Sequence, residues 1–119
     1  MKKIVVMIFL ILSAICLAEE IVADSLNVKP KLVFMEFGST KCIPCIQMEE
    51  VMEQIKEHYP QSVEVIFTNV MKEKNKAKEY DVRIIPTQII LDAEGNEIFR
   101  HKGYFPFEDI QKLFEENGV

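Results

Sequence analysis

The sequence predicts an α/β domain with a mixed central sheet that is covered by helices on both faces. Two apolar segments rich in strand-forming residues are each followed by a helical segment, which is the pattern of parallel crossover units. Further along the chain, two short strand-like segments flank a turn that contains a glycine, which is typical of an antiparallel hairpin. The 119 residues, of which 49% are hydrophobic and 28% charged, fit one globular domain.

The first half of the domain contains one strand and one long helix. The strand, residues 31–37, is almost continuously apolar, as is typical of strands buried on both faces of a sheet. A loop at residues 38–41 leads to a helix that begins near Cys42, carries apolar residues at helical spacing and ends before Pro60. Residues 19–29 have few apolar anchors and are interpreted as a lead-in with a short edge strand.

The second half contains three strands and two helices. Residues 63–68 predict a second buried strand, and residues 72–80 predict a short, highly charged surface helix. Residues 87–91 and 97–101 form the predicted hairpin. An amphipathic helix over residues 107–117 closes the chain. The predicted order is therefore β-α-β-α-β-β-α.

Residues 1–18 have the layout of a secretory signal peptide, which leaves residues 19–119 as the mature domain. Two lysines precede an apolar run of 15 residues, which is shorter than the roughly 20 residues that a membrane-spanning helix requires. We expect cleavage after Ala18 and export to the periplasm or to the outer face of the cytoplasmic membrane. The alternatives are an uncleaved anchor and lipidation of Cys16, which the bulky residue before that cysteine disfavours.

The charge balance argues against nucleic acid as a partner. The chain has 14 Lys and Arg against 19 Asp and Glu, and cleavage would remove two of the lysines and leave a formal charge of −7. Nucleic-acid binding requires a basic surface instead. Cleavage would also remove one of the three cysteines and leave only Cys42 and Cys45. Outside the cytoplasm such a pair is either a permanent disulfide or a working redox couple.

Cys42 and Cys45 are separated by two residues at the predicted start of the helix. A helix N-terminus carries about half a positive charge and unpaired N–H groups, which favour a thiolate, so Cys42 is the expected nucleophile. Cys45 follows within one turn, where it is placed to attack a mixed disulfide and release the product. Pro44 fits the first turn, where its missing N–H has no cost.

Three other interpretations of the cysteine pair remain open. A zinc site needs two more ligands, and the candidates His58 and His101 are 43 positions apart and are interpreted as surface residues. A purely structural disulfide would close so small a loop that it removes little entropy from the unfolded chain. The third interpretation is a redox domain that has lost its activity.

These motifs together resemble the thioredoxin superfamily. The resemblance covers roughly residues 25–117 and depends on features that occur in the family's order: a strand ending in Glu36-Phe37, then Cys42-Ile43-Pro44-Cys45, Ile85-Pro86-Thr87, Gly95 in the hairpin and Gly103 before the last helix. It implies a thioredoxin-like fold and a protein-disulfide oxidoreductase that cycles Cys42 and Cys45 between dithiol and disulfide without a bound cofactor. We expect a monomer that acts on protein substrates with disulfides.

The export signal and the Cys-Ile-Pro-Cys motif are similar to those of bacterial and archaeal thioredoxin-like proteins associated with membrane-embedded thiol-electron transporters of the cytochrome c biogenesis type. This resemblance implies such a transporter as a partner. Ile43 and Pro44 offer neither charge nor hydrogen-bond donor to stabilise the reduced thiolate, so we expect a reductase of protein disulfides. The alternatives are a disulfide-forming oxidant or isomerase, and a non-catalytic binding module.

The resemblance also implies roles for residues around the cysteines. Pro86 falls on the family's cis-proline, and Ile85 before it would offer backbone groups to an extended client chain. Thr87, Pro44 and Lys41 complete the expected client-binding surface. Lys41 replaces a usual tryptophan and is either a solvated loop lysine or a cation that helps to hold the nucleophilic thiolate.

Glu36 lies six residues before Cys42, where thioredoxins have a buried aspartate that moves protons to and from the resolving cysteine. A carboxyl inside an apolar strand should have a raised pKa and exchange a proton near neutrality. Phe67 stands where a thioredoxin lysine usually pairs with this acid, and the missing lysine should raise the pKa further. The alternative is a partly exposed glutamate at a strand end with no role.

Overall fold

The structure is a computed structural model that describes residues 28–119. The predicted signal peptide, its cleavage site and the lead-in strand up to residue 27 lie outside the described residues. Within them the predicted order of elements is confirmed, with bounds that differ by one or two residues: β1 (Leu32–Gly38), α2 (Ile43–His58), β2 (Val63–Asn69), α3 (Lys74–Glu79), β3 (Thr87–Asp92), β4 (Glu97–Lys102) and α4 (Phe107–Glu116). None of the helices in this range is long and apolar enough to cross a membrane.

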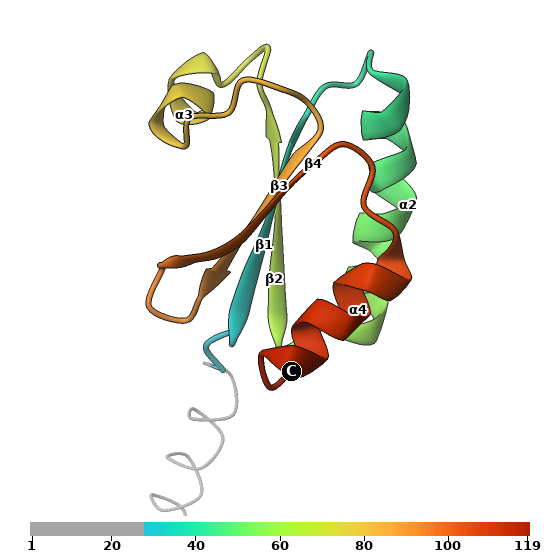
Figure 1. The fold of residues 1–119 in the computed structure, drawn as a ribbon, viewed down its shortest axis with the longest axis vertical. Helices are drawn as coiled ribbons and strands as arrows, with labels where there is room; N and C mark the ends of the chain where they lie inside the picture. The colour runs from blue at the N-terminus through green and yellow to red at the C-terminus, as the bar shows by residue number, and fades with distance from the viewer. Residues whose placement is uncertain (1–27) are drawn as a thin grey trace, which may run out of the picture.

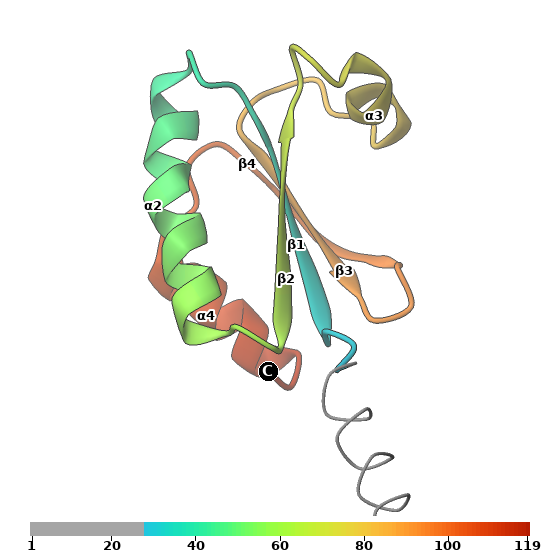
Figure 2. The same ribbon diagram turned by 180° about the vertical axis from the view of Figure 1, so that it is seen from behind.

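The strands form one mixed sheet in the order β2-β1-β3-β4. β1 and β2 run parallel and are connected through α2, whereas β3 runs antiparallel to both β1 and β4. α2 and α4 cover one face of the sheet, and α3 lies on the other (Figures 1 and 2). The predicted mixed sheet with helices on both faces is thus confirmed.

The main core lies between the sheet and the helices α2 and α4. Its fully buried side chains come from both layers: Phe34, Met48, Ile55, Ile90, Ile110 and Phe114. Burial of each such side chain stabilises the fold by about 1.5–3 kcal/mol. On the opposite face a smaller cluster of Met35, Phe37 and Ile89 packs against Tyr80, which follows α3. β1 therefore buries side chains on both faces, as its apolar sequence predicts.

β2 differs from the predicted second buried strand. Within residues 28–119 it forms an edge of the sheet, and its Glu64 and Phe67 side chains are exposed. Val63 and Val65 pack into the core beneath α2. On the other face Ile66 packs against the smaller cluster and Thr68 is buried. The prediction of a fully buried strand was wrong because a strand-forming run of six residues looks the same in a central strand and in an edge strand.

The helical layers on the two faces of the sheet carry opposite charge. α2 contains four glutamates and one lysine, and α4 contains four acidic residues and one lysine, so each has a formal charge of −3. α3 contains three lysines and one glutamate, which gives a formal charge of +2. The sheet therefore separates an acidic helical layer from a basic one.

Candidate redox site

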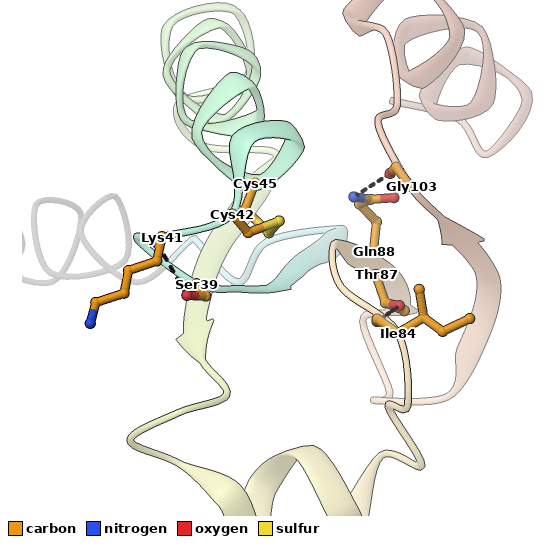
Figure 3. The surroundings of a disulfide bond; sticks show 8 residues. All are labelled: Ser39, Lys41, Cys42, Cys45, Ile84, Thr87, Gln88 and Gly103. Atoms are coloured by element: carbon orange, nitrogen blue, oxygen red, sulfur yellow. Dashed lines mark hydrogen bonds between the residues drawn. A yellow bond between two sulfur atoms is a disulfide. The ribbon is translucent and has the colours of Figure 1, made fainter.

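The two cysteines lie where the chain leaves β1 and enters α2. Cys42 is the N-cap residue of α2 with extended backbone (φ −103°, ψ 120°), and Pro44 lies in the first turn. The Ile46 N–H donates a helical hydrogen bond to the Cys42 carbonyl oxygen at 3.0 Å. Cys42 and Cys45 form a disulfide, with their Cα atoms 5.2 Å apart (Figure 3). The pair therefore lies at the positive end of the helix dipole.

The two cysteines differ in exposure. Cys42 is partly exposed at the surface, whereas Cys45 is only 2% exposed and belongs to the buried side of α2. An incoming client disulfide therefore meets the sulfur of Cys42 first. This asymmetry supports attack by Cys42 and resolution by Cys45, as does the position of Cys42 at the helix terminus.

Gly38 allows the end of β1 to approach Cys45 closely. A Cβ atom at this position would lie 3.2 Å from the Cβ atom and 3.3 Å from the Sγ atom of Cys45, and 3.4 Å from Cε2 of Phe67. Gly38 was predicted in the loop, but it is the last residue of β1. A glycine directly after an apolar strand and shortly before a Cys-x-x-Cys helix was the sequence signal that could have indicated this close approach.

The segment before β3 lies at the same end of the sheet as the disulfide (Figure 3). The Ile85–Pro86 peptide bond is cis, Pro86 and Thr87 are buried, and Ile85 is half-buried. The Thr87 hydroxyl donates to the Ile84 carbonyl oxygen at 2.6 Å, and the Gly103 N–H donates to the Pro86 carbonyl oxygen at 2.8 Å. These hydrogen bonds hold the backbone opposite the disulfide in a fixed shape.

Lys41 and Pro44 flank the disulfide in different ways. Lys41 is exposed, and its ammonium group points away from the two sulfur atoms (Figure 3). Its backbone N–H donates to the Ser39 hydroxyl oxygen at 3.2 Å. In the oxidised protein, Lys41 is therefore a solvated loop residue. Pro44 is half-buried within the first turn of α2.

Exposed apolar side chains surround this end of the sheet. They come from the start of α2 and from the connections that follow β2, precede β3 and follow β4: Ile43 (75% exposed), Met71 (64%), Ile84 (55%) and Tyr104 (46%). We call these four residues the apolar rim. Apolar surface of this kind is typical of sites that bind other molecules.

Glu36 is buried in β1 on the same face of the sheet as Gly38. It is 0% exposed, and neither of its carboxyl oxygens has a hydrogen-bond partner. Because it precedes Gly38 by two residues, it lies about 7 Å along the strand from the residue that meets Cys45. Burial raises the pKa of Glu36 to about 8, against a smaller lowering effect of the Gln88 side chain. The alternative of a partly exposed glutamate is therefore wrong.

Two polar residues near Glu36 were missed as parts of the site. Gln88 is 0% exposed, its Nε2 donates to the Gly103 carbonyl oxygen at 3.1 Å, and its Oε1 lies 3.1 Å from Nδ1 of His101. His101 is half-buried and stacks on Phe105 with ring centroids 4.3 Å apart, so its interpretation as a surface residue was wrong. A single glutamine within an otherwise apolar strand was the signal that could have revealed this contact.

The other histidine, His58, is exposed, as predicted, with its Nδ1 atom 2.9 Å from the Gln54 carbonyl oxygen. This is a contact within α2, away from the N-terminal turn that holds the cysteines. Across residues 28–119, no group of three or more His, Cys, Asp or Glu side chains is arranged to hold a metal ion.

The sequence matches a known protein family over most of its length. A family model described as a thioredoxin-like domain matches residues 18–118. A thioredoxin-like protein from Synechocystis sp. is 31% identical over 81 residues, which cover 68% of this chain and 76% of that protein. A thioredoxin from Chlorobaculum thiosulfatiphilum is 30% identical over 87 residues, which cover 73% of this chain and 80% of that protein.

Solved structures with a similar fold include two thioredoxins. Chloroplastic thioredoxin z has a TM-score of 0.68 and 20% identity, with 75% of this chain and 80% of that chain covered. A mutant thioredoxin from Halobacterium salinarum has a TM-score of 0.69 and 23% identity, with 82% of this chain and 83% of that chain covered. At these identities the likeness shows the fold alone.

Proposed function

The chain belongs to the thioredoxin-like family, and from this premise we propose that it is an exported thiol-disulfide oxidoreductase that reduces disulfides in client proteins. The observation that carries the proposal is the Cys42–Cys45 disulfide at the start of α2, with the first cysteine accessible and the second buried. The apolar rim beside the disulfide supports protein chains as clients.

In the first step, the Cys42 thiolate of the reduced protein attacks one sulfur of the client disulfide. A bond forms between Cys42 Sγ and that sulfur while the client S–S bond breaks, and the second client sulfur leaves as a thiolate that takes a proton from water. The fixed backbone of residues 84–87 would pair with an extended client segment through main-chain hydrogen bonds. Such pairing recognises a chain rather than one particular side chain.

In the second step, ionised Glu36 accepts the proton of the Cys45 thiol, and the Cys45 sulfur attacks Cys42 Sγ. The intramolecular disulfide forms, the mixed disulfide breaks, and the client sulfur leaves as a thiolate that takes the proton back. The client gains two electrons and the cysteine pair loses two. With a pKa of about 8, Glu36 is ionised in about a tenth of the molecules at pH 7, and the protonated form is ready to donate.

The direction of electron flow follows from what stabilises the Cys42 thiolate. Ile43 and Pro44 supply neither charge nor hydrogen-bond donor, and the Lys41 ammonium points away from the sulfurs (Figure 3). The helix N-terminus is then the main stabilising feature. Strong oxidants near about −120 mV owe their potential to a stabilised reduced form, so this couple should lie nearer thioredoxin, at about −270 mV.

A reductase outside the cytoplasm needs electrons from across the membrane, because its surroundings oxidise thiols. A membrane-embedded thiol-electron transporter of the cytochrome c biogenesis type would supply them. Its dithiol would attack the Cys42–Cys45 disulfide by the same exchange, and it would itself be oxidised. Residues 1–18 would bring the chain to the outer side of the membrane.

Equilibration of the purified protein with glutathione tests the reductase proposal. We expect a potential close to about −270 mV, whereas a value more positive than about −180 mV would identify an oxidant or isomerase. Insulin reduction with dithiothreitol as donor should be accelerated by the protein and not by a variant that lacks both cysteines. Failure of dithiothreitol to release two thiols from the folded protein would indicate a non-catalytic binding module.

A further inference from the structure

A row of four side chains crosses the sheet at Glu36. Glu36 on β1 pairs in register with Phe67 on β2 and with Gln88 on β3, and Gln88 pairs in turn with His101 on β4. Registered residues on antiparallel strands project from the same face and lie about 5 Å apart. The row is therefore apolar on the β2 side of Glu36 and polar on its β3 side.

The Gln88 amide is held in one orientation by its contacts. Its Nε2 donates to the Gly103 carbonyl oxygen at 3.1 Å, which turns its Oε1 toward His101 Nδ1, also at 3.1 Å. Because an amide oxygen only accepts hydrogen bonds, His101 Nδ1 carries the hydrogen. His101 is fixed in turn by stacking on Phe105, with the ring planes 15° apart.

Gln88 is the polar residue that pairs in register with Glu36. Neither Glu36 oxygen has a hydrogen-bond partner, and burial raises the pKa of Glu36. The Gln88 side chain acts in the opposite direction, because an amide N–H favours the charged form of a carboxyl. Nε2 of Gln88 has a second hydrogen besides the one that it donates to Gly103.

We propose that Gln88 and His101 are positioning residues for Glu36: His101 orients the Gln88 amide, and this amide sets the pH at which Glu36 releases its proton. The role in turnover rests on the proposed function, in which Glu36 is the base for Cys45. The positioning itself is measurable without a client. Phe67, on the other side of Glu36, has no polar group that could change the pH at which Glu36 releases its proton.

The other groups that face Glu36 leave its titration easy to identify. Cys45 in the first turn of α2 and Cys42 at its N-cap do not titrate while they are joined as a disulfide. β2 and β3 contribute Phe67 and Gln88, which do not titrate either. β4 contributes His101, whose pKa is lowered by burial against an opposing effect of Asp109 on α4. α3 lies on the opposite face of the sheet (Figure 1).

The test is a carbon-13 NMR titration of the glutamate carboxyl groups in the oxidised full chain, with the Glu36 signal identified by its loss in Glu36→Gln. The wild-type midpoint should lie near pH 8. Gln88→Leu removes the neighbouring amide dipole at similar volume and should raise the midpoint by about one pH unit. His101→Phe keeps an aromatic ring but removes the N–H, so it should also raise the midpoint. His101→Gln retains an N–H donor and should restore it.

His58→Phe is the matched control, because His58 is exposed and lies outside the row. In this variant the Glu36 midpoint should equal that of the wild type. Unchanged midpoints in both Gln88→Leu and His101→Phe would overturn the proposal. If Gln88→Leu does not fold, the comparison of His101→Phe with His101→Gln decides alone, and equal midpoints in these two variants count against the proposal. A glutathione equilibrium that identifies an oxidant would overturn the reductase function and leave this titration unaffected, so the two failures are distinguishable.

Discussion

The different exposure of Cys42 and Cys45 predicts which step of the reaction each cysteine variant loses. Cys42 is partly exposed and Cys45 is 2% exposed. Cys42→Ser should therefore abolish activity, whereas Cys45→Ser should attack clients and stop at the mixed disulfide. Mass spectrometry of alkylated client complexes measures the difference. Mixed disulfides through Cys45 in the Cys42→Ser protein, and none in the converse variant, would reverse the roles.

Glu36→Gln should slow turnover while leaving client binding nearly unchanged, because it removes the base and keeps the shape. General acid-base catalysis contributes at least about a hundredfold, so a loss of this order is expected in the resolving step. Rapid-quench measurement of mixed-disulfide decay isolates that step. A decay rate equal to that of the wild type would remove Glu36 from the mechanism.

The buried carboxyl also predicts how stability changes with pH. The pKa of Glu36 is about 8 in the folded protein against 4.5 in the unfolded chain, so between these values only the unfolded state loses the proton. The free energy of unfolding should fall by up to about 5 kcal/mol as the pH rises through this interval and then level off. Urea unfolding of the oxidised protein should show this fall in the wild type and not in Glu36→Gln. A variant less stable than the wild type at pH 8 would contradict the prediction.

The sequence predicted the site residues whose signals are local. Cys42 and Cys45 lie at the start of a helical pattern, and Glu36 is an acid inside an apolar strand, so the neighbouring residues in the sequence indicated their environments. Gln88 and His101 are 13 positions apart and meet through the register of the hairpin, which a search for ligand spacing does not detect. The register of a hairpin depends on both the turn and the buried face, so the pairing of Gln88 with His101 could not be predicted from the sequence alone.

At the scale of elements, the junction between β1 and α2 depends on Gly38. Gly38→Ala would place a Cβ atom 3.2 Å from Cβ of Cys45, so Cys45 has to shift by a few tenths of an ångström. We expect a loss of about 1–3 kcal/mol in the free energy of unfolding and a longer-lived mixed disulfide, because Cys45 is displaced. Thermal unfolding and mixed-disulfide decay measure the two effects. Thr40→Ala, in the exposed part of the same loop, is the control. Equal values for both variants would show that the junction has room for a side chain.

The elements with a clear apolar period were predicted well, and the others less so. β1 and α4 agree with the sequence to within one residue at each end. The charged helix was predicted from residue 72 but begins at Lys74, since the N–H groups of Lys72 and Glu73 both donate to the Asn69 carbonyl oxygen in a turn. The only buried side chain of α3 is Ala77, and one small apolar residue gives no periodic pattern that fixes where the helix begins.

At the scale of the whole molecule, residues 1–18 should direct the chain out of the cytoplasm. Protein recovered from the periplasm of an expressing bacterium should begin at Glu19 by mass spectrometry, as expected for cleavage after Ala18. Replacement of Lys2 and Lys3 by glutamate should reduce the exported fraction. Full-length protein retained in the membrane would indicate an uncleaved anchor, and a lipid on Cys16 would indicate a lipoprotein.

The opposite charges of the helical layers give the molecule an electric dipole that crosses the sheet. α2 and α4 together carry a formal charge of −6 on one side, and α3 carries +2 on the other. A charged client is therefore oriented as it approaches the protein, with its basic side attracted toward α2 and its acidic side toward α3. The Debye length falls from about 30 Å at 0.01 M salt to about 8 Å at 0.15 M, so this steering fades with ionic strength. Stopped-flow rates with a basic disulfide peptide should fall as salt is added, because salt weakens the encounter and leaves the sulfur chemistry unchanged.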